Sequence, residues 1–286
     1  MTEKVRIFEV GPRDGLQNET RIIPASDKIR LIDLLSCCGF AKIEATSFVA
    51  PKWVPQMADA DEVLRAIQRR PGVKYTALTP NLQGYLRAKA AGADEVAIFA
   101  SASESFSQKN INCSIAESLA RFRPVMAAAL ADGMPVRGYI SCAVACPYDG
   151  PTAPAAVAQL AAVLLEMGCY QVSLGDTIGA GAPDTIAAML TVVLTTIPAD
   201  CLAGHYHDTN ANALGNIDVS LDSGLRTFDT SVGGLGGCPF APGAKGNVST
   251  GAVVARMHGR GFTTGIDPDC LAAAAGFAET LKRGFP

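Results

Sequence analysis

The sequence has neither a clustered basic segment nor a long apolar run. Its Lys and Arg residues are scattered, and the formal net charge is only −3 over 286 residues. Proteins that follow a phosphate backbone usually carry a basic patch, so we expect no nucleic-acid partner. The longest apolar stretches, 153–165 and 187–197, are shorter than the roughly 18 residues that indicate a membrane span. We therefore expect no membrane partner and assign both stretches to buried helix faces.

Targeting signals are also missing from this sequence. The first four residues lead directly into a strand-like pattern without an apolar signal region, and the chain ends without a peroxisomal tripeptide. An Arg-rich, acid-poor transit segment is absent too. The nine cysteines consequently fit a reducing compartment better than a disulfide framework. We expect a cytoplasmic protein.

The composition indicates a large, well-packed core. Apolar residues make up 49% of the chain and charged residues only 18%. The length suits one (β/α)8 barrel, which takes about 250 residues plus additions. With no linker or low-complexity tract in view, residues 1–286 are predicted to form a single catalytic domain, with the barrel at about 5–260.

Short apolar runs alternate with longer amphipathic or Ala-rich segments through the whole chain, as expected of repeated βα units. The predicted strands are residues 5–10, 42–46, 74–78, 95–100, 136–142, 171–174, 202–207 and 227–231. The predicted helices are 26–38, 59–69, 82–91, 115–131, 155–167, 184–196, 211–223 and 249–258. A last helix at 267–283 is expected to cover one end of the barrel or to contact another subunit. The predicted fold class is α/β, a (β/α)8 TIM barrel with an additional C-terminal helix.

Helix ends carry recognisable residues. Left-handed C-caps are predicted at Gly39, Gly92, Gly133, Gly168 and Gly224. Helix starts are predicted at Ser26, Asp59, Asn81, Ser114 and Asp184.

Two of the three histidines in the chain, His205 and His207, end the seventh predicted strand. Residues two apart on a strand point to the same side, so both imidazoles can converge on one ion. A pair of packed, hydrogen-bonded histidines is the alternative. Because barrel enzymes build their sites at the C-terminal ends of the strands, the position favours a metal site.

Arg13 and Asp14 follow the first predicted strand in a turn shaped by glycine and proline. They can supply a metal ligand with a fixed cation beside it, or simply a surface ion pair. Glu44, Asp176 and Asn247 add oxygen donors at other strand ends. For Glu44 and Asp176, holding Arg13 or a loop is an equally good interpretation, since an inward charge in an apolar barrel must be paired or ligated.

Residues 231–243 are rich in glycine and contain Cys238. They fit a mobile lid carrying a reactive thiol, and a phosphate-binding loop or plain connection is the alternative. Lys245 either touches a phosphate or is solvated. For Cys142 and Cys146, packing near the site is favoured over metal binding.

Six motifs in this order resemble the DRE-type TIM-barrel metallolyases, and among them the 3-hydroxy-3-methylglutaryl-CoA lyase family. The resemblance runs over about residues 5–266. The motifs are Gly-Pro-Arg-Asp-Gly-Leu-Gln-Asn-Glu from Gly11, Ile-Glu-Ala-Thr-Ser-Phe-Val-Ala-Pro-Lys-Trp-Val-Pro-Gln-Met from Ile43, Gly-Tyr-Ile-Ser-Cys from Gly138, Leu-Gly-Asp-Thr-Ile-Gly from Leu174, His-Tyr-His-Asp-Thr from His205 and Gly-Leu-Gly-Gly-Cys-Pro from Gly234.

The resemblance implies a retro-aldol cleavage of 3-hydroxy-3-methylglutaryl-CoA to acetoacetate and acetyl-CoA. It implies Mg²⁺ or Mn²⁺ held by Asp14, His205, His207 and Asn247, although these ligands alone do not exclude zinc. The reaction also implies a place in leucine degradation and ketone-body formation. We further expect a homodimer, with residues 271–277 supplying either the contact or a barrel cap.

Residue roles follow from the same resemblance. Arg13 stabilises the thioester enolate oxygen and Cys238 delivers a proton to the acetyl-CoA carbanion. The group that takes the hydroxyl proton stays open between Asp14, Asp176 and Cys238 through water. Substrate contacts are assigned to Arg13, Gln17, Glu44, Ser47, Asn110, Tyr139, Ser141 and Thr177.

The sequence departs from the family pattern near the site. After Asn247 the usual two acidic residues are replaced by Gly251 and Ala252. A different acyl group, such as citramalyl-CoA or a longer 3-hydroxy-3-alkylglutaryl-CoA, is therefore an alternative substrate. A Claisen-type acyl-CoA synthase and a catalytically silent metal-binding barrel are further alternatives.

Overall fold

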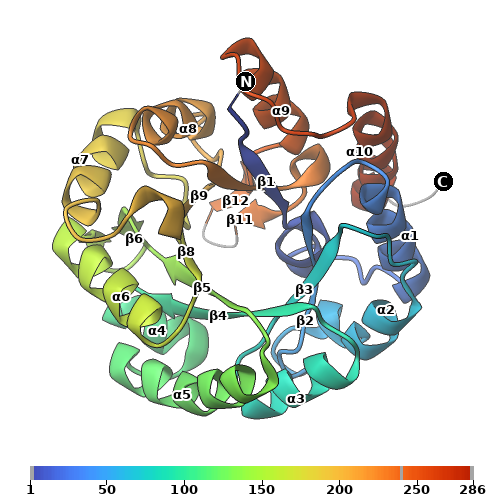
Figure 1. Ribbon diagram of the computed structural model, residues 1–286, viewed down its shortest axis with the longest axis horizontal. Helices are drawn as coiled ribbons and strands as arrows, with labels where there is room; N and C mark the ends of the chain where they lie inside the picture. The colour runs from blue at the N-terminus through green and yellow to red at the C-terminus, as the bar shows by residue number, and fades with distance from the viewer. Residues whose placement is uncertain (1–2, 239–240, 284–286) are drawn as a thin grey trace.

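Eight parallel strands close into a barrel, as the sequence predicts (Figure 1). The structure, a computed structural model, describes residues 3–238 and 241–283, and for residues 237, 238, 241–245 and 283 it describes the backbone alone. Around the barrel the strand order is β1-β10-β9-β8-β5-β4-β3-β2. The strands are β1 (Arg6–Glu9), β2 (Lys42–Ser47), β3 (Lys74–Leu78), β4 (Glu95–Ser101), β5 (Val136–Ser141), β8 (Gln171–Asp176), β9 (Leu202–Tyr206) and β10 (Thr227–Thr230).

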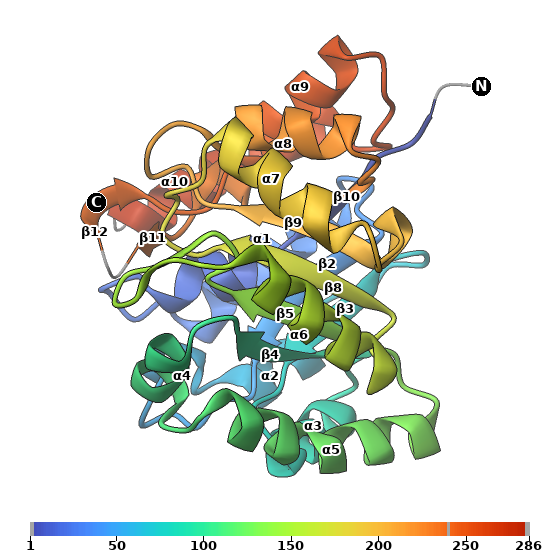
Figure 2. The same ribbon diagram turned by 90° about the vertical axis from the view of Figure 1, so that its left-hand side faces the viewer.

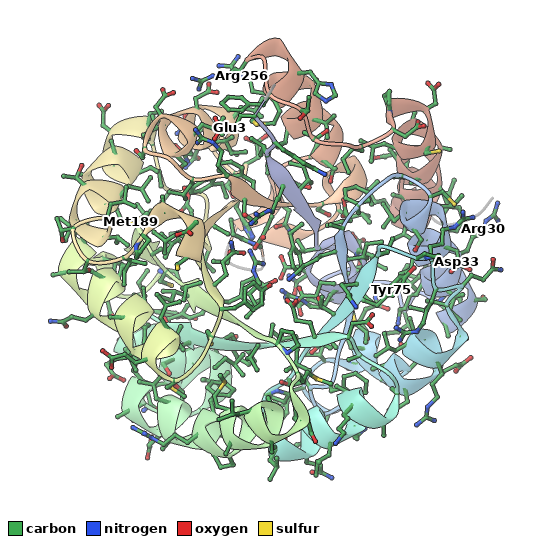
Figure 3. The ribbon with its side chains drawn as sticks, in the orientation of Figure 1. Glu3, Arg30, Asp33, Tyr75, Met189 and Arg256 are labelled. Atoms are coloured by element: carbon green, nitrogen blue, oxygen red, sulfur yellow. The ribbon has the colours of Figure 1, made fainter. Side chains whose placement is uncertain are left out.

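Helices surround the barrel (Figures 1 and 2). They are α1 (Ala25–Ser36), α2 (Ala60–Ala66), α3 (Leu82–Ala90), α4 (Glu104–Ile111), α5 (Ile115–Asp132), α6 (Pro154–Glu166), α7 (Pro183–Val193), α8 (Ala213–Asp222), α9 (Thr250–Gly259) and α10 (Pro268–Arg283). Side chains of the strands fill the barrel interior (Figure 3). Within the described residues, no helix is long and apolar enough to cross a membrane.

Short turns and hairpins lie in the loops that connect the strands and helices. A π-type turn η1 (Gly11–Gly15) follows β1, and a 3-10 turn η4 (Val232–Gly234) follows β10. Further 3-10 turns are η2 (Pro55–Met57) and η3 (Ala199–Cys201). Two small antiparallel hairpins pair β6 (Ala145–Cys146) with β7 (Gly150–Pro151), and β11 (Gly237–Cys238) with β12 (Ala241–Lys245).

Helix α4 was not predicted from the sequence. Its segment is short and mostly exposed, and only Phe106 and Ser107 along it are buried, so it has no apolar stripe to reveal it. The local signal is the N-cap, where the Ser103 hydroxyl accepts a hydrogen bond from the backbone N–H of Phe106 at 3.0 Å.

The predicted helix ends are partly correct. All five predicted C-cap glycines have positive φ, and the side chains of Asn81 and Ser114 cap α3 and α5. The prediction for Ser26 is wrong because α1 begins at Ala25 after Pro24, and that for Asp184 is wrong because α7 begins at Pro183. Pro183 occupies the first helical position of α7, where no N–H is needed, whereas Pro24 stands at the N-cap of α1. Asp59 precedes α2, but its carboxylate binds Lys28 instead of the helix N–H groups.

The C-terminal helix α10 packs beside α1 in the outer ring (Figure 1). The guanidinium of Arg30 lies 4.5 Å from the ring centre of Phe277. Leu271, Phe277 and Leu281 are buried within this chain. Helix α10 also packs against η4 (Val232–Gly234), and Ala272 and Ala273 are exposed, so the expectation that residues 271–277 supply a subunit contact or a barrel cap stays a prediction.

Candidate active site and metal centre

Asp14, His205 and His207 converge at the C-terminal end of the barrel. Asp14 lies in η1 after β1, and His205 lies in β9, which is separated from β1 only by β10. One ligand atom from each of the three lies within 4.8 Å of the others. The expected convergence is therefore present, and these residues form a group that can hold a metal ion.

Asn247 joins this group through the backbone and the side chain. The predicted strand 202–207 is one residue too long, since β9 ends at Tyr206. His207 instead forms an isolated antiparallel bridge with Asn247. The Asn247 side-chain amide donates a hydrogen bond to Oδ2 of Asp14 at 2.7 Å. Its amide oxygen is the atom that a cation would use.

The charges of these residues fit a divalent cation. Burial acts to raise the pKa of Asp14, but Arg13 and the two histidines outweigh it and hold that pKa well below its usual range. Burial lowers the pKa of His207 to about 4, so its imidazole is neutral and able to ligate. Among the described residues, the buried Nδ1 of His207 has no hydrogen-bond partner. Burial acts to lower the pKa of His205, but Asp229 and Asp14 outweigh it and raise that pKa. An ionised carboxylate oxygen and imidazole nitrogens in their neutral form are suitable ligands for a divalent metal.

Arg13 is a buried cation and not part of a surface ion pair. Its side chain is 6% exposed, and its Nε donates to Oε2 of Glu44 at 2.6 Å. Nη1 of the same guanidinium contacts Oδ1 of Asp14, and its centre lies 5.5 Å from the ring centre of Tyr139. Two carboxylates thus fix Arg13 directly beside the group that can hold a metal.

Asp176 ends β8 and organises the loop that follows. Its two oxygens accept hydrogen bonds from the backbone N–H groups of Ala180, at 3.1 Å, and Gly181, at 2.9 Å. Burial raises the pKa of Asp176 to about 6, against these two hydrogen bonds. Asp176 therefore shapes a loop and also has a pKa in the range useful for proton transfer.

The other predicted contact residues are spread over the same end of the barrel. Ser47 ends β2, Ser141 ends β5, and Thr177 directly follows β8. Gln17 follows η1 and is partly exposed, whereas Asn110 lies on the exposed face of α4. None of these five has a described contact with Asp14, His205 or His207, so their assignment as substrate contacts stays a prediction.

The cysteine predictions separate into two cases. Cys142 and Cys146 are buried with Phe106 in a small cluster, as favoured from the sequence, and the described metal-binding group does not include them. The backbone of Cys238 lies in β11, but its side chain lies outside the described residues, and so does that of Lys245.

The buried charged residues Arg137, Asp229 and Glu9, which lie on strands of the barrel, were not selected from the sequence. Arg137 and Asp229 form an ion pair of 2.8 Å inside the barrel, and Oδ2 of Asp229 lies 3.2 Å from Nδ1 of His205. Glu9 is also fully buried and accepts hydrogen bonds from Gly11, Val232 and Thr250. The available signal is a charged residue within a predicted strand, whereas the sequence pattern selects polar residues at the strand ends.

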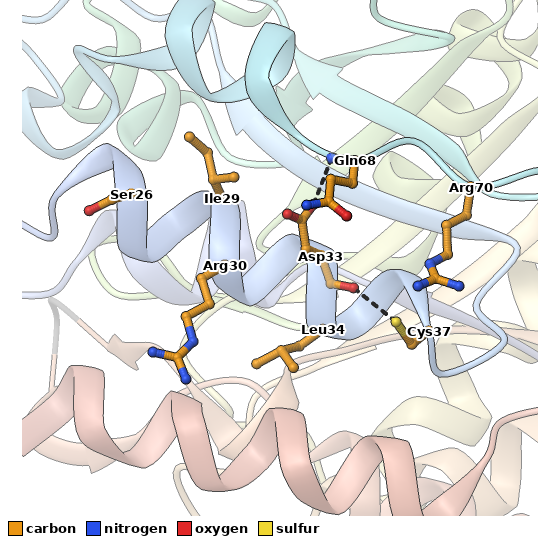
Figure 4. A pocket seen from close by; sticks show the side chains of 8 residues that line it. All are labelled: Ser26, Ile29, Arg30, Asp33, Leu34, Cys37, Gln68 and Arg70. Carbon is orange, nitrogen blue, oxygen red and sulfur yellow. Dashed lines mark hydrogen bonds between the residues drawn. The ribbon is translucent and has the colours of Figure 1, made fainter.

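A surface hollow lies away from this group, on the outer ring (Figure 4). It has a volume of about 320 Å³ and is lined by residues of α1, including Arg30, Asp33 and Cys37, together with Gln68 and Arg70. It includes no residue of the C-terminal strand ends. This hollow is not the site that contains Asp14 and the histidines.

A closed βα barrel with two histidines, an aspartate and a buried arginine at its C-terminal end belongs to the class of metal-dependent barrel enzymes. The family model described as HMGL-like matches residues 4–277, and the chain belongs to this family. By this membership it is a carbon–carbon lyase.

Known relatives agree over nearly the whole chain. The cytoplasmic 3-hydroxy-3-methylglutaryl-CoA lyase of Danio rerio is 59% identical over 263 residues, covering 92% of this chain and 78% of the relative. The crystal structure of the HMG-CoA lyase from Brucella melitensis is 61% identical, with a TM-score of 0.97, and the match covers 98% of this chain and 99% of that one. The hydroxymethylglutaryl-CoA lyase of Pseudomonas mevalonii is 52% identical over 270 residues, covering 94% of this chain and 90% of the relative.

Proposed function

We propose that this chain cleaves 3-hydroxy-3-methylglutaryl-CoA to acetoacetate and acetyl-CoA with the help of Mg²⁺ or Mn²⁺. The observation that carries the proposal is the grouping of Asp14, His205 and His207 within 4.8 Å, directly beside the buried Arg13. Relatives at 52–59% identity named as lyases of this thioester support the choice of substrate.

We assign the metal ligands to Asp14, His205, His207 and Asn247. The low pKa of Asp14 and the neutral state of His207 support this set. When bound, a divalent ion polarises the hydroxyl and carboxylate oxygens of the substrate and lowers the pKa of the hydroxyl. Asn247 holds Asp14 in place through its side-chain amide.

Arg13 binds the thioester oxygen, on which negative charge develops as the carbon–carbon bond breaks. Glu44 holds the guanidinium through Nε, so the charge is already oriented before the substrate arrives. Preorganised donors of this kind stabilise developing oxyanions more effectively than water does, because they need no reorientation during the reaction.

Two proton transfers complete the reaction. Asp176 takes the proton of the tertiary hydroxyl, and its pKa of about 6 supports this choice over Asp14. The electrons of that O–H bond form the ketone of acetoacetate, and those of the broken carbon–carbon bond form the acetyl-CoA enolate. Cys238 then gives its thiol proton to the enolate carbon. Gln17, Ser47, Asn110, Tyr139, Ser141 and Thr177 contact the substrate.

The test is acetyl-CoA release from 3-hydroxy-3-methylglutaryl-CoA by metal-stripped protein, with and without Mg²⁺ or Mn²⁺. We expect acetoacetate to form only after metal is restored, and an Asp14→Asn variant to stay inactive. Citramalyl-CoA serves as a competing substrate. Cleavage of citramalyl-CoA alone would keep the chemistry and change the acyl group, and cleavage of neither would contradict the proposal.

We propose that the chain acts as a single catalytic domain and forms a homodimer. Leu86 on α3 and Leu130 on α5 are exposed apolar side chains, 53% and 84% exposed, on two helices that pack against each other, and we place the contact on this side of the molecule. Light scattering after size exclusion tests the dimer, with Leu130→Lys as the disrupting variant. A monomeric mass for the unaltered protein would contradict it.

A reducing cytoplasm, and a role in leucine degradation and ketone-body formation, complete the proposal. All eight cysteines with described side chains are free thiols, which supports a reducing compartment. Relatives include both cytoplasmic and mitochondrial lyases. Fractionation of the source cells, followed by detection of the protein, tests the compartment.

A further inference from the structure

A buried ion pair lies inside the barrel below the metal-binding group. Arg137 on β5 and Asp229 on β10 both have side chains that are 0% exposed, and Nη2 of Arg137 lies 2.8 Å from Oδ1 of Asp229. Removing two charges from water is costly, and a well-packed apolar pair would often stabilise a core equally well. The pair is therefore better explained by what it does for neighbouring groups than by stability.

The second carboxylate oxygen of Asp229 faces the imidazole of His205. Its Oδ2 accepts a hydrogen bond from the Ser173 hydroxyl at 2.7 Å and lies 3.2 Å from Nδ1 of His205. Its Oδ1 is at the same time paired with the guanidinium of Arg137, which is always protonated in proteins, so the carboxylate of Asp229 is ionised. An ionised carboxylate only accepts hydrogen bonds, so the Nδ1 atom facing it must carry a proton.

Arg137 in turn is held on several sides. Its Nε donates to Oε1 of Gln171 at 3.2 Å, and its Nη1 donates to the Tyr139 hydroxyl at 3.1 Å. Its guanidinium also lies 4.3 Å from the ring centre of Phe8. The cation that keeps Asp229 ionised is thus fixed by neighbours from separate strands.

We propose that Arg137 and Asp229 are positioning residues that hold His205 in its Nδ1–H tautomer and aim the Nε2 lone pair at the metal site. Nε2 of His205 lies 3.8 Å from Oδ2 of Asp14, on the side opposite Asp229. Carboxylates that accept a hydrogen bond from a metal-binding histidine orient the ring and raise its basicity. The metal role of His205 rests on the proposed function, whereas its tautomer can be measured without any metal.

The two histidines of the site differ in what lies next to their Nδ1 atoms. Nδ1 of His207 has no hydrogen-bond partner among the described residues, so no comparable carboxylate fixes its ring. His205 is therefore the imidazole whose orientation the barrel interior determines, and its loss of orientation should weaken metal binding.

The test is ¹⁵N NMR of histidine-labelled, metal-free protein. The chain has only three histidines, and His258, whose Nε2 lies 3.1 Å from the Thr264 hydroxyl, is an internal reference outside the site. Spectra are recorded at a pH high enough for His205 to be neutral. We expect a protonated Nδ1 and an unprotonated Nε2 for His205. The opposite tautomer in the unaltered protein would overturn the proposal.

The matched variants are Asp229→Asn and Asp218→Asn. Asp229→Asn replaces a carboxylate oxygen by an NH2 group, which can donate a hydrogen bond to Nδ1 of His205. Asp218→Asn instead removes the charge from a surface pair, that of Asp218 with Arg256. We expect Asp229→Asn to abolish the preference for the Nδ1–H tautomer and to weaken Mn²⁺ binding, followed by EPR, about 10- to 100-fold. Asp218→Asn should change neither. Unchanged tautomer and affinity in a folded Asp229→Asn variant would refute the proposal.

Failure of folding leaves the proposal testable. If Asp229→Asn does not fold, the Arg137→Met/Asp229→Asn double variant removes both charges of the pair at once. The tautomer of His205 in the unaltered protein decides the proposal in either case. If the unaltered protein shows the expected tautomer but binds no Mn²⁺, the proposed function fails while the positioning of His205 stands.

Discussion

Nε of Arg13 donates a hydrogen bond to Oε2 of Glu44 across 2.6 Å, which joins the turn after β1 to the interior of β2. Both side chains are buried. The remaining oxygen of Glu44, Oε1, has no hydrogen-bond partner among the described residues. The guanidinium of Arg13 therefore has a fixed orientation as well as a positive charge. A substitution that keeps the charge but loses the orientation separates the two contributions.

Replacing Arg13 by Lys keeps the charge but removes the planar donor group that Glu44 and Asp14 hold. Lys is a flexible point charge and does not reproduce this geometry. We expect kcat for acetyl-CoA release to fall about 10²–10³-fold, measured with saturating metal and thioester. Arg226→Lys, at an Arg–Glu pair near the surface, is the control. Full turnover by Arg13→Lys would contradict the proposed role.

Replacing Cys238 by Ser tests the thiol in the glycine-rich loop. Serine keeps the size but is a much weaker acid, so proton delivery to the enolate should slow by about 10²–10⁴-fold. Metal affinity should stay unchanged because no metal role is assigned to this residue. Cys37→Ser, at an exposed cysteine, is the matched control. Equal kcat values for both variants would remove Cys238 from the mechanism.

Glu9 predicts a specific pH dependence of stability. Burial raises its pKa to about 7 from an unfolded value of 4.5. Between these two pH values the folded state binds more protons than the unfolded state, so the free energy of unfolding falls as pH rises. The difference amounts to about 3 kcal/mol once both states are ionised.

The Glu9→Gln variant should lack this dependence. Its side-chain oxygen can still accept from Gly11 and Val232, and its amide can donate to the Thr250 hydroxyl. Urea unfolding at pH 5 and pH 8 should therefore show a smaller stability loss in Glu9→Gln than in the unaltered protein. Parallel pH profiles for the two proteins would show that Glu9 is ionised at both pH values.

Gly15 predicts close packing between η1 and the loop after β10. A Cβ at this position would lie 2.7 Å from Cβ of Leu235 and 2.8 Å from Oγ of Ser231. We expect Gly15→Ala to displace the loop that leads to Cys238, to destabilise the fold by about 1–3 kcal/mol and to lower kcat. Thermal unfolding and turnover measure the two effects.

Gly259→Ala is the control for this variant. A Cβ there meets nothing within 4 Å, and alanine is favoured over glycine in a helix by about 0.5–1 kcal/mol. It should be neutral or slightly stabilising and fully active. If Gly15→Ala behaves in the same way, the loop does not pack against η1 as closely as these distances require.

Sequence periodicity and end signals were sufficient for the barrel. All eight strands and the C-terminal helix were predicted, because buried parallel strands are short apolar runs and their helices are amphipathic or Ala-rich. Helix α4 was missed because it buries little surface. The helix starts at Ser26 and Asp184 were wrong because prolines at positions 24 and 183 already set the start.

The residue types of the site were also determined by the sequence. Asp14, His205 and His207 were chosen because strand alternation and strand ends are local properties that a sequence displays. The packing of α10 on α1 and the pairing of Arg137 with Asp229 were decided only by the tertiary structure. In each case the partners are far apart in the chain, and only closure of the barrel brings them together. The same closure places Glu44 of β2 beside Arg13 and Asp229 of β10 beside His205, so it also decides how these two side chains are held.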